Sequence, residues 1–245
     1  MKKVILDNVS KNYKLYNSLT YGFKNFVLKF PKSLIDLKKN SFKVLENVSF
    51  SVSDGECVGI LGRNGSGKST ILSLIAGVIK PDKGRIEIKG RVTPMLELGS
   101  GFHPELTGIE NIYLNGVLLG LRRREIKEKI EDIIDFSELG DFIYQPIKHY
   151  SSGMLARLGF SISSILNPDI LLIDEILAVG DYKFQEKCRK KMLELKKSGS
   201  TIILVSHSNS DIEFLCDRAI LIHNGKVVID GDVKSAIKEY LKILS

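Results

Sequence analysis

A glycine-rich segment between an apolar run and a helical pattern constrains this chain more than any other feature. Residues 62–70 read Gly-Arg-Asn-Gly-Ser-Gly-Lys-Ser-Thr, which fits the pattern G-x-x-x-x-G-K-[ST]. The apolar run 57–61 precedes it, and a helix is predicted over 68–76, closed by Gly77 and Pro81. Glycines let successive backbone N–H groups turn toward phosphate oxygens, and a helix N-terminus adds about half a positive charge. The segment predicts a strand, a phosphate-binding loop and a helix; the alternative is a glycine-rich turn that binds nothing.

The residue types in this loop suit a nucleotide. The Lys68 side chain would bridge the β- and γ-phosphates, and the Ser69 hydroxyl would be a ligand of Mg²⁺. The predicted cofactors are therefore ATP and Mg²⁺. The residues expected to bind the ATP phosphates are Gly62, Asn64, Gly65, Ser66, Gly67, Lys68, Ser69 and Thr70.

Two further apolar runs end in residues that could act on a bound nucleotide. Asp174 ends the run 169–174 and is followed by Glu175, while His207 ends the run 201–207. Ligands of open α/β sheets collect outside the carboxyl ends of the strands. We expect Asp174 to reach Mg²⁺, Glu175 to polarise the attacking water as a general base, and His207 to sense the γ-phosphate. A purely structural histidine is the alternative for His207.

The pattern of the strands predicts an α/β fold with a parallel-sheet core. The three apolar runs are short, rich in β-branched residues and apolar on both faces, as buried parallel strands are. Residues 4–13, 44–52 and 85–92 predict a small antiparallel sheet beside this core. Residues 219–230 predict a hairpin with Asn224-Gly225 at its turn.

A helical subdomain is predicted over about 97–166, where no strand pattern is found. Thr107 and Glu110 form a capping-box pattern at the start of one helix. Other helices are predicted over 125–136, 151–166, 181–197 and 232–244. The whole chain, 1–245, would then be a single domain with a core of 1–96 and 167–245.

Composition excludes several classes of protein. Hydrophobic residues make up 43% of the chain and charged residues 27%, as in an ordinary soluble domain. Three cysteines without paired spacing favour a reducing compartment. The apolar run after Lys3 is too short for a signal peptide, and no run approaches the ~18 apolar residues of a membrane-spanning helix.

The positive charge of the chain is concentrated near its N-terminus. Residues 1–43 contain ten lysines against Asp7 and Asp36, an excess that is larger than the net charge of +7 of the whole chain. A nucleic-acid groove spreads its basic residues over a face, so no nucleic-acid partner is predicted. In the stretch 14–43 the lysines alternate with aromatic and aliphatic residues, which suits a membrane surface at the headgroup boundary. A solvated loop is the alternative.

With these motifs assembled, the chain resembles the ATP-binding subunit of an ABC transporter over nearly all of its 245 residues. Residues 150–154, Tyr-Ser-Ser-Gly-Met, stand where that family has its L-S-G-G-Q signature and differ from it at three places. The resemblance implies that Ser151, Ser152 and Gly153 bind a nucleotide held by the opposite protomer. A pair of serines that only cap a helix is the alternative.

The resemblance assigns three more residues. Asp181 matches the D-loop aspartate, which communicates between the two sites of a dimer. Tyr13 matches the aromatic residue that stacks on adenine, with Tyr16 as a rival and a buried strand tyrosine as the alternative. The usual Q-loop glutamine is absent, and Glu97 is the nearest polar residue.

The segments 96–111, 150–154 and 175–181, and the insertion 14–43, look like those of ATPases that export bacterial O-antigen, teichoic acid or capsule. That resemblance implies a homodimer with two MgATP molecules between its protomers, bound to a dimeric integral-membrane permease. It also implies a peripheral protein on the cytoplasmic face of the bacterial inner membrane, which residues 14–43 would contact.

Other functions remain open at this point. Export of a lipid or a drug would use the same ATPase. A soluble ABC ATPase acting on nucleic acid or ribosomes usually has paired cassettes or a long coiled coil, and neither is found in this sequence. A small-molecule kinase would share the phosphate loop, but it would leave the signature-like segment without a role.

Overall fold

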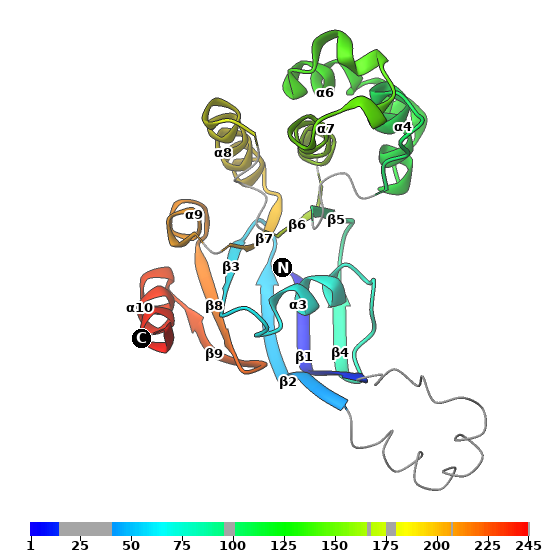
Figure 1. The fold of residues 1–245 in the computed structure, drawn as a ribbon. Coiled ribbons are helices and arrows are strands. Elements are labelled where there is room, and N and C mark those ends of the chain that lie inside the picture. Colours follow the sequence, from blue (N-terminus) through cyan, green and yellow to red (C-terminus); the bar gives the residue numbers. More distant parts are fainter. Residues whose placement is uncertain (15–40, 96–100, 166–167, 175–179, 207, 245) are drawn as a thin grey trace, which may run out of the picture.

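The computed structural model describes residues 1–14, 41–95, 101–165, 168–174, 180–206 and 208–244. They form two sheets and a separate group of helices (Figure 1). The larger sheet has the strand order β5-β6-β7-β3-β8-β9, with β9 antiparallel to β8 and the other neighbours parallel. Its strands are β5 (Val92–Met95), β6 (Ile170–Asp174), β7 (Thr201–Val205), β3 (Cys57–Leu61), β8 (Arg218–His223) and β9 (Lys226–Gly231). The predicted parallel core is confirmed.

The smaller sheet is antiparallel and has the order β2-β1-β4. Its strands are β1 (Lys2–Lys14), β2 (Ser41–Ser53) and β4 (Lys83–Ile88). The predicted small antiparallel sheet is confirmed. The predicted end of its third strand at residue 92 was wrong, because β4 ends at Ile88 and β5 begins in the other sheet at Val92. Gly90, at φ +123°, turns the chain between the sheets, and the Arg91 N–H donates to the Asp169 carboxylate at 2.8 Å.

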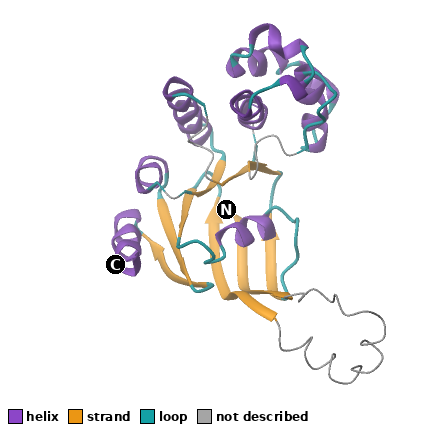
Figure 2. Ribbon diagram, in the orientation of Figure 1, coloured by secondary structure: helices purple, strands orange, loops and turns teal. Residues whose placement is uncertain are grey.

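The parallel strands are apolar on both faces because each face packs against a different layer. On one face Val58 and Ile60 pack with helix α3 (Lys68–Ile75) and the antiparallel sheet. On the other face Cys57 and Leu61 pack with three helices on the opposite side of the sheet (Figures 1 and 2). These helices are α8 (Tyr182–Lys197), α9 (Asn209–Leu215) and α10 (Val233–Leu244). Helix α9 was not predicted from the sequence.

Four helices form the helical subdomain, which stands apart from both sheets in Figure 1. They are α4 (Gly108–Leu118), α5 (Arg123–Lys127), α6 (Ile130–Ser137) and α7 (Ser152–Ile165), with short 3₁₀ turns at Gly140–Tyr144 and Ile147–His149. Their buried side chains form a core of their own. The single helix predicted over 125–136 is in fact α5 and α6, since the Lys129 N–H bonds to the Ile126 carbonyl and interrupts the α-helical pattern.

Several local predictions are confirmed. Strand β3 has the predicted bounds, and Asn224 and Gly225 form the predicted turn with φ of 48° and 72°. Thr107 and Glu110 form the predicted capping box. Among the described residues no helix is both long and apolar enough to cross a bilayer. Residues 15–40 of the basic insertion lie outside the described residues.

Candidate functional site

The glycine-rich loop lies between β3 and α3 and is shaped by steric constraints. Gly67 has φ of +106°, and a Cβ atom there would lie 2.5 Å from Cδ2 of Leu45. A Cβ atom on Gly62 would lie 2.4 Å from the carbonyl oxygen of Ile222. Both distances are shorter than real Cβ contacts. At Gly62 the obstacle is backbone, so that position requires glycine, whereas at Gly67 a side chain would have to displace Leu45 and adopt a strained positive φ.

The Lys68 side chain lies inside the loop and binds its backbone. Its side chain is buried, and Nζ donates to the carbonyl oxygens of Gly62 at 2.8 Å and Arg63 at 3.2 Å. The Ser66 hydroxyl is also buried, and among the described residues it has no hydrogen-bond partner. A buried ammonium beside a buried hydroxyl without a partner, at a helix N-terminus, fits an anion with several oxygen atoms. The residues present therefore fit the phosphates of a nucleotide.

Ser69 and Asp174 meet at the edge of the loop. The Ser69 hydroxyl donates to Oδ2 of Asp174 at 3.2 Å. Asp174 ends β6 and is the register partner of Val205, the last residue of β7. A hydroxyl and a carboxylate side by side are oxygen ligands of the kind that Mg²⁺ prefers. The sequence predicted both residues as ligands of Mg²⁺. The fold brings them together although they are 105 positions apart in the chain.

Two aromatic residues, Tyr13 and Phe42, lie opposite each other on β1 and β2. Their side chains are exposed, at 41% and 56%, so Tyr13 is not a core residue. Opposite residues of an antiparallel pair project from the same face, and Lys11 Nζ lies 5.9 Å from the Tyr13 ring centroid. Sequence reasoning missed Phe42, although an aromatic residue at the start of the second strand was a signal. The rival Tyr16 lies outside the described residues.

The signature-like residues lie at the N-terminus of α7, in the helical subdomain. Ser151 and Ser152 are exposed and Gly153 is half-buried. The Ser151 hydroxyl caps the helix by accepting the Met154 N–H at 3.2 Å. A Cβ atom on Gly153 would have only Ser151 Oγ within 4 Å, at 3.8 Å. Among the described residues of a single chain, the end of this helix is therefore open.

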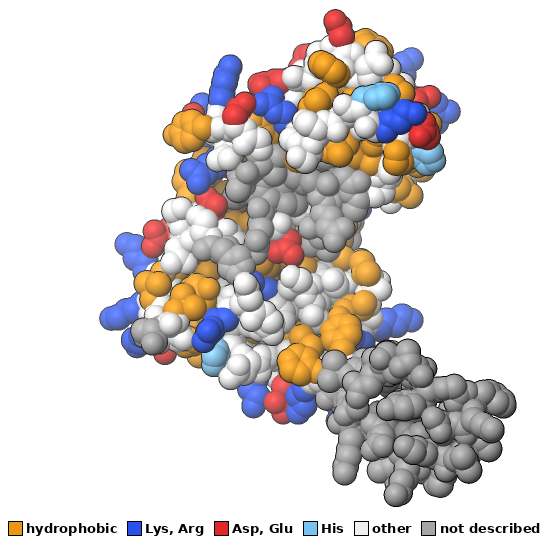
Figure 3. Space-filling model, in the orientation of Figure 1, with side chains coloured by type: hydrophobic (Ala, Val, Ile, Leu, Met, Phe, Trp, Pro, Cys, Tyr) orange, Lys and Arg blue, Asp and Glu red, His pale blue; other side chains and the backbone are white. Residues whose placement is uncertain are grey.

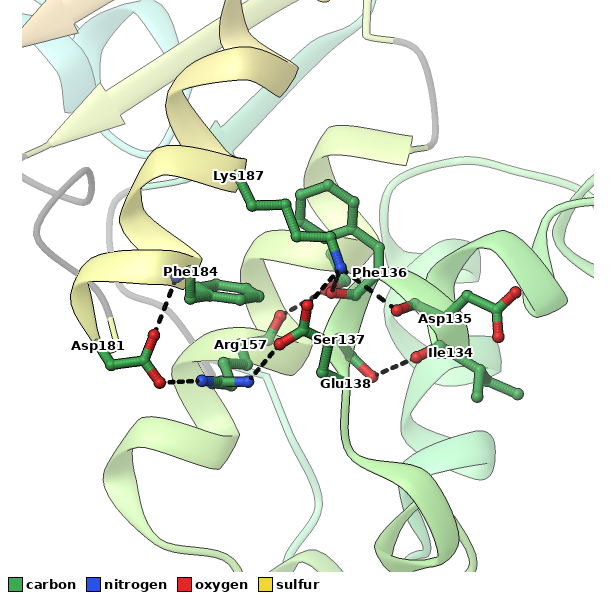
Figure 4. A network of polar contacts seen from close by, with 10 residues as sticks. Ile134, Asp135, Phe136, Ser137, Glu138, Arg157, Asp181, Phe184 and Lys187 are labelled. Atoms are coloured by element: carbon green, nitrogen blue, oxygen red, sulfur yellow. Dashed lines mark hydrogen bonds and ion pairs between the residues drawn. The ribbon is translucent and has the colours of Figure 1, made fainter.

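Asp181 caps α8 and connects it to α7. Its Oδ1 atom accepts the Phe184 N–H at 2.9 Å, and its Oδ2 atom pairs with Nη2 of Arg157 at 2.7 Å (Figure 4). The Phe184 N–H, with a smaller contribution from Arg157, holds the pKa of Asp181 below its ordinary value. Arg157 belongs to α7, six residues after Ser151. Sequence reasoning missed Arg157, because its partner lies in a different subdomain.

The structure thus brings together the loop residues around Lys68 and the pair Ser69 and Asp174. Tyr13 lies on β1, whereas Ser151 to Gly153 belong to the helical subdomain and Asp181 to the start of α8. Asn64 and Gly65 are exposed on the loop, and Thr70 is half-buried in α3. The predicted residues Glu97, Glu175 and His207 lie outside the described residues.

The chain is similar in sequence to known proteins. A family model described as ABC transporter matches residues 45–178. The O-antigen export system ATP-binding protein RfbB of Klebsiella pneumoniae is 52% identical over 246 residues, covering 100% of both chains. The teichoic acids export ATP-binding protein TagH of Bacillus anthracis is 46% identical over 99% of this chain and 43% of its own length.

Solved structures with the same fold include an ATP-binding subunit of an ABC transporter, with a TM-score of 0.77 at 24% identity over 97% of this chain and 93% of its own. Another is a dimeric ATP-binding cassette in a post-hydrolysis state bound to ADP and phosphate, with a TM-score of 0.74 at 23% identity over 94% of this chain and 98% of its own. The chain therefore belongs to the ABC transporter family, and it has the fold of that family's ATP-binding cassettes.

Proposed function

We propose that this chain is the ATP-binding and ATP-hydrolysing subunit that powers export of a polysaccharide, of O-antigen, teichoic acid or capsule type, through a membrane permease. The observation that best supports ATP binding and hydrolysis is the contact of Ser69 with Asp174, next to the buried Lys68. The similarity to RfbB of Klebsiella pneumoniae over the whole chain supports the class of cargo, which is lipid-linked in this proposal.

The loop residues bind the ATP phosphates. The buried Ser66 hydroxyl and the Lys68 ammonium supply donors, together with backbone N–H groups of the loop. To reach the phosphates, Lys68 exchanges its loop carbonyl acceptors for phosphate oxygens. Ser69 and Asp174 hold Mg²⁺, which supplies charge compensation for the phosphates.

Hydrolysis is assigned to residues at the strand ends. Glu175 directs a water molecule at the γ-phosphate as general base, since it directly follows Asp174 in the chain. His207 and Lys68 offset the charge that develops on the phosphate oxygens. The adenine ring stacks on Tyr13, whose exposed side chain is available for this contact.

Two copies of the chain form a head-to-tail dimer. The open end of α7 supports this arrangement, because Ser151, Ser152 and Gly153 have room to bind a nucleotide held by the partner. Asp181 lies between the two sites and links them. The dimeric cassette among the solved structures has the same fold. ATP closes the dimer, and hydrolysis reopens it.

The permease receives this motion through the helical subdomain and the region of Glu97. The subunit lies on the cytoplasmic face of the bacterial inner membrane, where residues 14–43 contact anionic headgroups. Nucleic acid is not a partner in this proposal. On the face drawn in Figure 3, the basic and acidic side chains of the described residues are intermixed and form no continuous basic stripe.

The ATPase is tested by the substitution Glu175→Gln. We expect the variant to bind MgATP as the original chain does and to release phosphate roughly 10²–10⁴-fold more slowly. The assay contains no acceptor other than water, so the phosphate that is released comes from hydrolysis of ATP. Unchanged turnover would remove Glu175 as the base.

The cargo is tested by purifying the tagged chain from its native membranes in mild detergent and identifying the bound proteins by mass spectrometry. We expect a multi-spanning permease together with enzymes of glycan synthesis. A permease that co-purifies with proteins of lipid or drug export would change the inferred cargo. The inferred ATPase activity would still hold. Ribosomal components alone would overturn the export function.

A further inference from the structure

Two of the three cysteines lie side by side in the core, between the larger sheet and the layer of α8, α9 and α10 (Figure 1). Sγ of Cys57, the first residue of β3, is 3.7 Å from Sγ of Cys216, which directly follows α9. The two residues are 159 positions apart in the chain, so no spacing in the sequence indicates the pair. The third cysteine, Cys188, is buried in α8, and among the described residues its sulfur has no such contact.

Backbone hydrogen bonds hold the two cysteines together. Strands β3 and β8 are parallel neighbours, in which Val58 is the register partner of Arg218. One position earlier, the Asp217 N–H donates to the Cys57 carbonyl at 2.8 Å, and the Cys57 N–H donates to Oδ2 of Asp217 at 2.9 Å. Cys216 directly precedes Asp217, so the pairing of the chains brings its sulfur next to that of Cys57.

Helix α8 fixes the neighbours of Cys216. Nζ of Lys196 donates to the Leu215 carbonyl at 2.7 Å and pairs with Oδ1 of Asp217 at 2.6 Å. The backbone on both sides of Cys216 is therefore held in place. A bond between the two sulfur atoms would need rotation of the side chains and a small movement at the end of α9, and no refolding of the strands.

Gly59 makes room for Cys216 above β3. It lies in the middle of the strand, where glycine often marks the close approach of another part of the chain. A Cβ atom there would lie 2.8 Å from Cγ2 of Ile212 and 3.2 Å from Sγ of Cys216. Helix α9 therefore lies directly on the backbone of β3 and covers the two cysteines.

The two thiols differ in how readily they can meet an oxidant. Cys57 is 0% exposed, whereas Cys216 is 9% exposed. The hydrogen bond to Cys216, and then burial, raises the pKa of the Cys57 thiol. A thiol that keeps its proton is a poor nucleophile. Cys216, at the edge of the core, is therefore the residue that reacts first.

We propose that Cys57 and Cys216 form an oxidation site covered by α9, at which a peroxide converts the two thiols into a disulfide that slows ATP hydrolysis. The site itself does not depend on the proposed function, whereas its effect on hydrolysis rests on it. Reversible disulfides of this kind are the ones that proteins of a reducing compartment use.

The oxidation takes two steps. Sγ of Cys216 attacks hydrogen peroxide, the O–O bond breaks, Cys216 becomes a sulfenic acid, and one water leaves. Sγ of Cys57 then attacks the sulfur of Cys216, the S–O bond breaks, and the hydroxyl group leaves with the Cys57 proton as a second water. Two thiols and one peroxide thus give one disulfide and two waters. A thiol reductant reverses the reaction by exchange.

The disulfide affects hydrolysis through the segments that it joins. It shortens the distance between the sulfur atoms from 3.7 Å to about 2 Å, which draws the end of α9 toward β3. The phosphate loop follows β3, and Ser208, which caps α9, directly follows His207 in the chain. The bond therefore changes how the segment after His207 lies against the strand that leads to the loop.

The first test treats the full chain with hydrogen peroxide and maps its disulfides by mass spectrometry. The dose is set so that Met1, which is 77% exposed, is oxidised. We expect one disulfide, between Cys57 and Cys216, which dithiothreitol reduces again. Cys188 should stay reduced, because burial raises its pKa to about 12. Reduced Cys57 and Cys216 in a chain with oxidised Met1, or a disulfide to Cys188, would overturn the proposal.

The effect on function is measured as phosphate release before and after oxidation. We expect kcat of the original chain to fall about tenfold and to recover with dithiothreitol. Cys216→Ala cannot form the bond, so peroxide should leave its kcat unchanged. Cys188→Ala is the matched control, which removes a buried cysteine outside the pair and should respond as the original chain does. A disulfide without a change in kcat, or an equal loss in Cys216→Ala, would refute the effect on hydrolysis.

The cover is tested at Ile212, the residue of α9 that lies on Gly59. Ile212→Ala loosens α9, so the disulfide should form about tenfold faster. Ile133→Ala removes an equally buried isoleucine from the helical subdomain and should leave the rate unchanged. Equal rates in both variants would refute α9 as the cover. If the original chain fails to hydrolyse MgATP, the proposed function fails, while the mapped disulfide and its rate of formation still decide the oxidation site.

Discussion

The phosphate loop and the signature end of α7 are built in opposite ways. The loop is defined by its backbone, since Gly62 admits no side chain and one at Gly67 would have to displace Leu45. Lys68 is 7% exposed. The end of α7 is an exposed helix terminus held to α8 by the ion pair of Arg157 with Asp181. The shape of the loop is thus fixed within one chain, whereas the signature end, which we propose to be half of a dimer site, is held by a contact between side chains.

The largest effect that this comparison predicts is at Lys68. Lys68→Ala should lower ATP hydrolysis by roughly 10³-fold or more and weaken nucleotide binding, because the phosphates lose their buried cation. Phosphate release and nucleotide titration measure the two effects. Lys83→Ala removes an exposed lysine of β4 and is the control. Wild-type hydrolysis in Lys68→Ala would show that the loop does not bind the reacting phosphates.

The rigidity of the loop is tested by comparing Gly67→Ala with Gly77→Ala. Both glycines have positive φ, so alanine costs about 1–2 kcal/mol of unfolding free energy at either position. Only at Gly67 does the new Cβ atom also collide with Leu45, which adds about 1–3 kcal/mol. Urea unfolding should show the larger loss for Gly67→Ala, which should also lose nucleotide binding. Equal losses would mean that Leu45 yields and that the loop is not sterically fixed.

The same contrast explains what the sequence could and could not predict. The strand, loop and helix around Lys68 follow from local residue types, and so does the capping box at Thr107. The pair Arg157 and Asp181 depends on how two separate bodies pack, which no local pattern records. For the same reason the predicted end of the strand over 85–92 was wrong, since the turn at Gly90 carries the chain between sheets.

A smaller effect is predicted at the signature end, where Ser151 has two candidate roles. Loss of a helix cap costs about 1 kcal/mol in Ser151→Ala and only a few tenths in Ser151→Gly. If the hydroxyl also binds the partner's nucleotide, both variants should lose about tenfold in ATP-driven dimerisation, measured in the Glu175→Gln background. If instead Ser151→Gly dimerises almost as well as the original chain and only Ser151→Ala is impaired, the effect follows the strength of the helix cap. Ser151 would then act as a helix cap and not as a nucleotide ligand.

The smallest effect concerns the pH dependence of the ion pairs that Glu138, at the end of α6, makes with Arg157 of α7 and Lys187 of α8. The hydrogen bond from Lys187 holds the pKa of Glu138 below its ordinary value of 4.5. The ion pairs of Glu138 therefore contribute stability that is present above the pKa of the unfolded chain and is lost as the pH falls through the lower folded value. Because the Glu138 side chain is 36% exposed, we expect less than about 1 kcal/mol.

Urea unfolding of the original chain and of Glu138→Gln between pH 7 and pH 3 measures this contribution. The difference in unfolding free energy should be constant near neutral pH. It should shrink as the pH falls below the ordinary pKa of 4.5 and vanish below the lower folded pKa, where both chains carry a neutral group at position 138. Glu128→Gln, on the exposed pair with Arg124, should show a smaller difference at every pH. A Glu138→Gln difference that does not change at all between pH 7 and pH 3 would mean that Glu138 acts through packing and not through its charge. The contact of α6 and α7 with α8 would then be fixed by shape, as the phosphate loop is, and the contrast between the two regions would be lost.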